Sequence, residues 1–199
     1  MHARPCQELT PELLLRAYAA GFFPMAEDRN GPTAWYSPDP RAIIPLDRFK
    51  ISRSLRQRAH KGQLEIRINT SFAEVMRRCA AREETWISDE IIQAYCRLFD
   101  MGHAHSVESW QHGRLVGGLY GVTLGGAFFG ESMFSQVTDA SKIALWYLIR
   151  RLTERGFLLL DTQFLTPHLA SLGACEISRD DYLSLLDRAL SIEATFTRK

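Results

Sequence analysis

Three strand-like segments follow one another between residues 103 and 134, and two very short turns connect them. The segments read HAHSVESW, RLVGGLYGV and AFFGESMF, and the turns read QHG and TLGG. Turns this short join antiparallel neighbours, because a parallel connection needs a much longer crossover. The sequence therefore predicts a strand meander, and the segments before and after it must pack against that sheet.

Helical segments flank the predicted meander on both sides. The first is punctuated by a candidate cap at Thr10, by Pro11 at the first helical position and by Gly21 at its end. The expected helices cover residues 9–21, 51–62, 71–82, 88–102, 139–156, 166–173 and 178–190, and further strands cover 63–69 and 157–164. This order predicts an α+β fold with a mixed sheet at its centre.

Residues 22–45 carry five of the eight prolines. Proline cannot donate to a strand ladder, so this segment is predicted to be loop with at most short edge strands. The end of the proline-rich segment suggests a boundary. We expect residues 1–49 to form a small N-terminal domain and residues 50–199 to form the main domain.

Cysteine usage and hydropathy exclude several classes of protein. The four cysteines are scattered without a C-x-x-C pair, which predicts free thiols in a reducing compartment; they are Cys6, Cys79, Cys96 and Cys175. No apolar run approaches the length of a membrane span, and the N-terminus lacks the order of a signal peptide. We therefore expect a cytoplasmic protein.

The charge is unevenly distributed, although the formal net charge is only +1. Between residues 48 and 67, seven lysines and arginines stand against the single acid Glu65. Most basic helices are solvated faces, but this enrichment makes phosphate contact a fair prediction. Trp35, Tyr36 and Trp86 lie in or beside loops, where aromatic rings either fill gaps in a core or stack on unpaired bases.

Two features of the meander each have two interpretations. Its recurrent glycines indicate either a bulged, twisted sheet or a groove that receives a ligand; they are Gly117, Gly118, Gly121, Gly125, Gly126 and Gly130. His103 and His105 share one face of a strand, as metal ligands often do. No third ligand has a matching spacing, so a structural pair is favoured over a metal site.

Polar residues interrupt two apolar strands. Asp161 and Gln163 follow a run of leucines, and in a regular strand they would share a face with Leu159. They either mark the point where the strand leaves the core or form a catalytic pair. Glu131 and Met133 share a face in GESMF. A carboxylate there needs a partner or solvent, so a rim position or ion pair is modestly favoured over a pocket for an apolar group and a cation.

Ten strings, in order, resemble the leucyl/phenylalanyl-tRNA–protein transferase family. They are AGFFPM, WYSPDPRAI, SRSL, TWIS, GHAHSVESW, LVGGLYGV, GESMFS, DASKIAL, DTQF and HLASLGACEISRDDYL, and the match runs from about Leu9 to Leu186. The family moves Leu or Phe from aminoacyl-tRNA onto the α-amino group of proteins that begin with Arg or Lys, which marks them for degradation. The resemblance implies a small N-terminal domain, a domain like the GCN5-related acyltransferases, and no metal or cofactor. We also expect a monomer.

The resemblance also implies roles for individual residues. Asp161 and Gln163 match the family's Asp-x-Gln catalytic pair. The match to the aminoacyl pocket consists of Leu119, Phe128, Glu131 and Met133, with Tyr95 on the bordering helix. Side chains that stack on the terminal adenosine match Trp86 and the pair Trp35-Tyr36, where Trp-Trp is common. The basic helix that faces the tRNA matches Arg53, Arg56 and Arg58. Thr166-Pro167 stands where the family often has an asparagine.

The implied mechanism needs little more than positioning, because the donor is already an activated ester. Gln163 is expected to orient the acceptor amine through its carbonyl, and Asp161 to support it as proton acceptor or electrostatic partner. Two rivals remain. A CoA-dependent N-acetyltransferase would need a glycine-rich pyrophosphate turn, which SQVTDASK lacks. A non-catalytic RNA-binding protein would have no use for the Asp/Gln pair.

Overall fold

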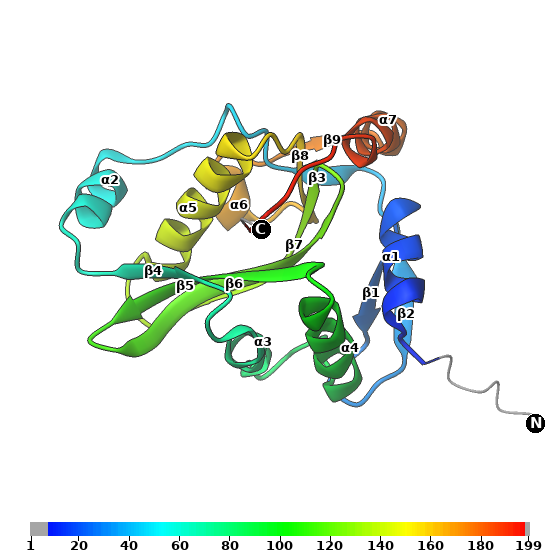
Figure 1. Cartoon of the computed structure of the whole chain (residues 1–199), viewed down its shortest axis with the longest axis horizontal. Helices are drawn as coiled ribbons and strands as arrows, with labels where there is room; N and C mark the ends of the chain where they lie inside the picture. The colour runs from blue at the N-terminus through cyan, green and yellow to red at the C-terminus, as the bar shows by residue number, and fades with distance from the viewer. Residues whose placement is uncertain (1–7, 198–199) are drawn as a thin grey trace, which may run out of the picture.

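A mixed sheet of seven strands forms the centre of the computed structural model, which describes residues 8–197 (Figure 1). The strands lie in the order β4-β5-β6-β7-β8-β3-β9. Only β7 and β8 run parallel, and the other neighbouring pairs are antiparallel. The seven strands are β3 Arg41–Ile43, β4 Glu65–Ile68, β5 Ala104–Gln111, β6 Arg114–Leu124, β7 Ala127–Ser135, β8 Leu159–Gln163 and β9 Cys175–Ile177. The predicted meander is confirmed as β5-β6-β7.

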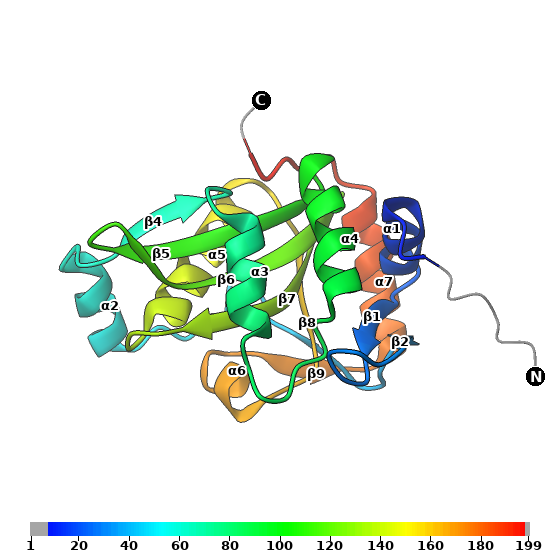
Figure 2. The same cartoon turned by 90° about the horizontal axis from the view of Figure 1, so that it is seen from below.

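Helices cover both faces of the sheet. Figure 2 shows α3 and α4 across one face, with α5 behind the sheet on the other. The helices are α1 Pro11–Ala19, α2 Arg53–His60, α3 Phe72–Ala80, α4 Asp89–Asp100, α5 Ala140–Glu154, α6 Pro167–Ser171 and α7 Arg179–Leu190. Each face therefore has its own hydrophobic cluster. The α+β class with a central mixed sheet is confirmed.

The proline-rich segment differs from its prediction. It contains a separate hairpin, β1 Phe23–Ala26 paired with β2 Thr33–Tyr36. Its third strand, β3, lies inside the main sheet between β8 and β9, and the expectation of edge strands alone is wrong there. Pro40 and Pro45 bracket this short strand rather than interrupt it, so its ladder keeps its donors. The sequence also gave no signal for β9, which is only three residues long.

The domain boundary after residue 49 stays a prediction. β3 precedes that boundary, yet it is a strand of the main sheet. The thiols of Cys79, Cys96 and Cys175 are free, and Cys6 lies outside the described residues. Within residues 8–197, none of the helices is both long enough and apolar enough to cross a bilayer.

Candidate active site

A bulge in β7 sets the geometry of the candidate site. Across β6 and β7, Tyr120 pairs with Ser132 and Gly121 pairs with Gly130, so Glu131 has no partner residue on β6. A Cβ at Gly121 would lie 2.3 Å from the Phe129 carbonyl oxygen, so only glycine fits there. The sequence pattern suggested a bulged sheet as one interpretation of the glycines, but it did not locate the bulge.

β7 and β8 diverge beyond the bulge. They pair only from Ala127 with Leu159 to Phe129 with Asp161, and then each strand continues without the other. A cavity of about 340 Å³ occupies the gap between them. Side chains from both hydrophobic clusters line it, so it passes from one face of the sheet to the other. Of the six glycines, Gly130 alone lines this cavity, so the interpretation of the glycines as a ligand groove stays a prediction.

The two ends of the cavity differ in chemistry. Its α5 end is apolar and is lined by Leu119, Met133, Leu145, Leu148, Leu160 and Leu169. The other end carries Phe23, Met25 and Trp86, and the polar groups of Glu131 and Gln163 lie between the strands. Such a cavity holds an apolar side chain at one end and presents polar groups to the rest of the same ligand.

Gln163 reaches the cavity because the chain turns sharply at this residue. Its backbone φ angle is +60°, a value that residues other than glycine rarely adopt. The Phe164 amide donates to the Thr162 carbonyl at 2.7 Å, and the Gln163 amide donates to Asp161 Oδ1 at 2.9 Å. The Asp161 carboxylate thus holds the turn that points Gln163 into the cavity.

Asp161 itself does not line the cavity, and its side chain is fully buried. Arg41 donates to both of its oxygens, from Nε at 3.0 Å and from Nη2 at 2.6 Å. Tyr182 donates from its hydroxyl to Oδ2 at 3.0 Å. With the Gln163 amide, these donors surround the carboxylate. Asp161 and Gln163 therefore do not share a face as they would in a regular strand, because the turn at Gln163 separates the two side chains.

Arg41 is a site residue that the sequence analysis missed. Burial lowers its pKa, but the hydrogen bond and the charge of Asp161 raise it, and the net shift is upward. Its guanidinium also donates to the Gly21 carbonyl at 3.0 Å and lies 4.7 Å from the centre of the Phe23 ring. A signal for Arg41 was present in the sequence. An arginine directly before the apolar run AII would be buried with it, and a buried charge needs a partner.

Glu131 is the only carboxylate among the described residues that line the cavity. Tyr18 donates to its Oε1 at 2.6 Å, Tyr95 donates to its Oε2 at 3.4 Å, and Gln163 Nε2 donates to Oε1 at 3.2 Å. The two tyrosine hydroxyls also bond to each other. Burial, and the charge of Asp161, raise the pKa of Glu131 from 4.5 to about 8, although these donors oppose the shift. At neutral pH this group is therefore mostly protonated.

Burial, and then the charge of Glu131, raise the pKa of both Tyr18 and Tyr95 well above 10. Both hydroxyls consequently remain donors over the whole physiological range. Tyr18 comes from α1, Tyr95 from α4 and Glu131 from β7. Three elements far apart in the sequence thus fix one carboxylate, and the sequence analysis did not foresee the contribution of Tyr18.

Two hydroxyls at the cavity wall have no hydrogen-bond partner within residues 8–197. They belong to Tyr120 and Thr162, and both residues line the cavity. The Tyr120 side chain is fully buried, so its hydroxyl has no access to bulk water either. A buried polar group without a partner is costly, and both hydroxyl oxygens lie behind the cavity surface rather than on it.

Comparison with known proteins identifies the family. The model of the leucyl/phenylalanyl-tRNA protein transferase family matches residues 43–187, and the model of its N-terminal domain matches residues 7–39. The chain belongs to the leucyl/phenylalanyl-tRNA–protein transferase family. This confirms the resemblance that the sequence strings indicated, and it makes the protein an aminoacyl-tRNA–protein transferase.

Curated relatives match this transferase over nearly their full length. The leucyl/phenylalanyl-tRNA–protein transferase of Herpetosiphon aurantiacus is 56% identical and covers 96% of this chain and 99% of its own. That of Cereibacter sphaeroides is 58% identical, with 95% and 89% covered. Among solved structures, L-PGS from Bacillus licheniformis is 17% identical with a TM-score of 0.42, over 80% of this chain and 55% of that chain.

Some of the residues expected in the aminoacyl pocket of the transferase line the cavity, and others do not. Leu119, Glu131 and Met133 line the cavity as expected. Phe128 does not line it, because it packs against Phe196 at 5.5 Å between ring centres in the α5-side cluster. Tyr95 lies behind Glu131 and reaches the site only through its hydrogen bond.

The aromatic residues expected to stack on adenosine are also divided. Trp86 lines the cavity, but Trp35 and Tyr36 do not. Both are 37% exposed on β2, and the Tyr36 ring stacks on Phe23 at 6.1 Å between ring centres. Tyr36 thus contacts Phe23, which lines the cavity, but does not line the cavity itself. Met25, which the sequence analysis did not single out, lines the cavity with Trp86.

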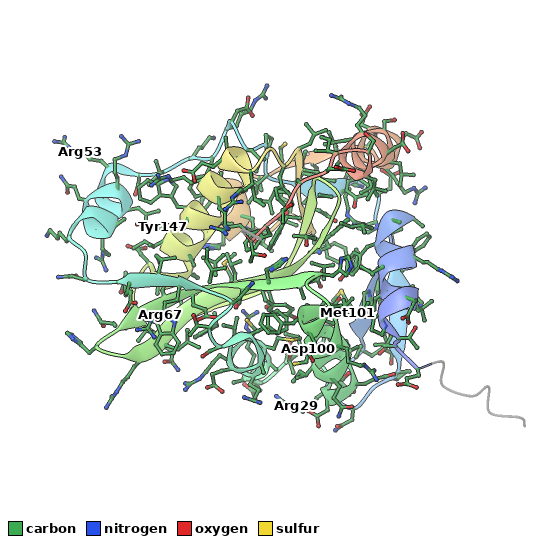
Figure 3. The ribbon with its side chains drawn as sticks, in the orientation of Figure 1. Arg29, Arg53, Arg67, Asp100, Met101 and Tyr147 are labelled. Carbon is green, nitrogen blue, oxygen red and sulfur yellow. The ribbon has the colours of Figure 1, made fainter. Side chains whose placement is uncertain are left out.

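The basic helix α2 stands apart from the cavity of the transferase. Arg53, Arg56 and Arg58 all lie on α2, and none of them lines the cavity. Figure 3 shows Arg53 pointing away from the molecule. Arg58 is held at the start of α5, where its Nε lies 3.4 Å from Asp139 Oδ2.

The histidine pair has hydrogen-bond partners inside the protein. His105 contacts Asn69 Nδ2 through Nδ1 at 3.0 Å and Thr123 Oγ1 through Nε2 at 3.2 Å. Burial, and then the charge of Arg151, lower the pKa of His105 to about 4, so the ring is neutral. The structural interpretation of the pair fits these contacts. Within residues 8–197, no group of three or more metal-ligating side chains is placed to hold an ion.

Proposed function

We propose that this protein transfers Leu or Phe from the acceptor end of Leu-tRNA or Phe-tRNA to the α-amino group of proteins that begin with Arg or Lys. The observation that carries the proposal is the cavity between β7 and β8, which joins an apolar end to the polar pair of Glu131 and Gln163. No cofactor is required, because the donor ester is already activated. The family's aminoacyl-tRNA donor supports a cytoplasmic location, and we expect the protein to act as a monomer with an acyltransferase-like main domain.

The apolar end is proposed to bind the side chain of the transferred amino acid. Its walls include Leu119, Met133 and Leu148. The side chains of these residues carry no charge and no strong hydrogen-bonding group. Burial of a Leu or Phe side chain there supplies roughly 1.5–3 kcal/mol of binding free energy. Methionine adapts to either shape. Side chains branched at Cβ would crowd the narrow gap between the diverging strands.

Trp86 is proposed to stack on the terminal adenosine. It lies at the opposite end of the cavity from the leucines, next to Met25. Base–aromatic stacking contributes about 1–3 kcal/mol per base. Trp35 and Tyr36, which we also expected to stack, lie outside the cavity, so in this proposal they contact at most the outer edge of the donor.

Glu131 and Gln163 are proposed to receive the acceptor amine. The Gln163 amide nitrogen donates to Glu131, so its carbonyl oxygen is free to accept from the amine. The pKa of Glu131, about 8, is close to that of an α-amino group, roughly 8. Matched pKa values allow the ionised fraction of Glu131, which grows as the pH approaches 8, to take a proton from the ammonium and so produce the nucleophile. Asp161 serves as a positioning residue, because it holds the turn at Gln163 through its hydrogen bond to the backbone.

The chemical step balances without an added reactant. The amine nitrogen forms the new bond to the ester carbonyl carbon, and the bond from that carbon to the ribose oxygen breaks. The proton held by Glu131 passes to the leaving ribose oxygen. The second proton of the attacking nitrogen then passes to Glu131 and from there to solvent, which leaves the amide N–H of the product.

The CoA-dependent alternative is disfavoured by the start of α5. Pyrophosphate binding at a helix start needs free backbone amides. Here the Ala140 amide donates to the Val137 carbonyl at 3.2 Å, and the Ser141 amide donates to Ser135 Oγ at 3.2 Å. A non-catalytic RNA-binding protein, the other alternative, would not require a carboxylate with a raised pKa inside the cavity.

One assay tests the proposal against both alternatives. The purified protein is given labelled Leu-tRNA or Phe-tRNA, labelled acetyl-CoA and a peptide that begins with Arg. We expect the leucyl or phenylalanyl label to appear on the peptide and the acetyl label to stay on CoA. A matched peptide with an acetylated N-terminus is the control and should remain unlabelled. Acetyl transfer, or RNA binding with no transfer, would reject the proposed function.

A further inference from the structure

A second cavity, of about 500 Å³, adjoins the one that holds Glu131 and Gln163. The two share the lining residues Arg82, Met133 and His168. The rest of the second cavity is formed by the end of α3, the end of β7 and the start of α5, including Arg78, Ser135 and Ser141. A ligand that extends past Met133 from the first cavity therefore enters the second.

Positive charge surrounds the second cavity. Arg78 and Arg82 line it, and none of the described residues that line it is acidic. Glu74 lies nearby and pairs with Arg78 at 2.7 Å and with Arg77 at 3.2 Å. One carboxylate shared by two arginines leaves a net positive charge. A cleft with this charge attracts an anion, and guanidinium groups bind phosphate with paired hydrogen bonds.

The positive charge continues from the second cavity to α2. Lys142 directly follows Ser141, which lines the second cavity at the start of α5. Asp139 contacts Lys142 at 3.2 Å and Arg58 at 3.4 Å. The start of α5 therefore lies between the second cavity and the basic helix, and the figures agree on this arrangement of α2 and α5 (Figures 1 and 2).

We propose that the second cavity binds the phosphodiester that links the terminal adenosine of the donor to the preceding nucleotide. Arg78 and Arg82 are its cationic partners, and the donor strand then crosses the start of α5 toward Arg58. Side chains rather than backbone amides hold the phosphate, because the Ala140 and Ser141 amides already have acceptors. This inference rests on the proposed function, which supplies the nucleotide donor.

Two minimal donors isolate the phosphate. One is adenosine esterified with leucine, which has no phosphate, and the other is the leucyl ester of cytidylyl-(3′→5′)-adenosine, which has one. The ratio of kcat/KM for the second donor to that for the first measures what the phosphate and its nucleotide contribute. We expect Arg78→Gln to lower this ratio roughly three- to tenfold, the range for an ion pair that is partly exposed or charge-assisted. Arg78→Gln combined with Arg82→Gln should lower it further.

Arg77→Gln is the matched control. Arg77 lies on the same helix and pairs with the same carboxylate, but it does not line the second cavity. The ratio of kcat/KM values for the two donors, measured on Arg77→Gln, should stay within about twofold of the wild-type ratio. Equal ratios for Arg78→Gln and Arg77→Gln would overturn the inference while leaving the proposed function intact. A wild-type protein that uses neither donor but transfers from tRNA would also overturn it, and no transfer from tRNA would reject the proposed function itself.

Discussion

Replacing Glu131 with glutamine removes the acid whose ionisation the folded protein opposes. The pKa of Glu131 rises from 4.5 to about 8 on folding, chiefly because of burial. Between these values the folded chain keeps a proton that the unfolded chain has lost. The free energy of unfolding therefore falls as the pH rises, by about 1.36 kcal/mol per pH unit. From about pH 5.5 to about pH 7.5 the loss is about 2 × 1.36 ≈ 2.7 kcal/mol.

Glutamine at position 131 has nearly the same shape and still accepts from Tyr18, but it does not titrate. Urea unfolding of both proteins at the two pH values measures the effect, since the other titrating groups are common to both and cancel in the comparison. We expect the wild type to lose about 2–3 kcal/mol more than Glu131→Gln over this interval. An equal pH dependence of the two proteins would refute the argument that burial holds the proton on Glu131. The same variant should also transfer about a hundredfold more slowly, because the proposed proton acceptor is gone.

Three further substitutions test the remaining parts of the site. Asp161→Asn leaves Arg41 as a buried charge without its counterion, so urea unfolding should show a loss of about 3–5 kcal/mol and an intact free energy of unfolding would contradict the pairing. Trp86→Ala should raise KM for the donor about tenfold in steady-state assays, whereas Trp35→Ala should change it less than about twofold; equal effects would reject the assignment of the stacking residue. Gly121→Ala forces a Cβ to within 2.3 Å of a backbone oxygen of β7, so thermal unfolding should show a loss of about 1–3 kcal/mol, and an unchanged midpoint would contradict the bulge geometry.

Local pattern predicted most of the secondary structure because each element carries its own signal. The meander was visible from strand-like runs separated by three- and four-residue turns, and the helices from their caps and terminal glycines. β3 was not predicted as an interior strand, because the prolines around it dominate the local signal. Its place between β8 and β9 depends on pairing with residues more than a hundred positions away.

Sequence strings also located the site, but they did not determine how its groups are arranged. Alternation along a regular strand predicted that Asp161 and Gln163 share a face. The folded chain breaks that alternation at Gln163, whose positive φ turns its side chain toward Glu131. Arg41 then donates hydrogen bonds to both carboxylate oxygens of Asp161.

The sequence alone indicated the family, through ten ordered strings that resemble it, and most of the helices and strands, through caps, turns and spacing. Tertiary structure alone decided that β7 and β8 diverge, that Glu131 sits on a bulge, and that Tyr18 and Arg41 complete the site. The physical reason is that strand register and buried hydrogen bonds depend on partners far apart in the chain. No periodicity within a segment encodes those partners.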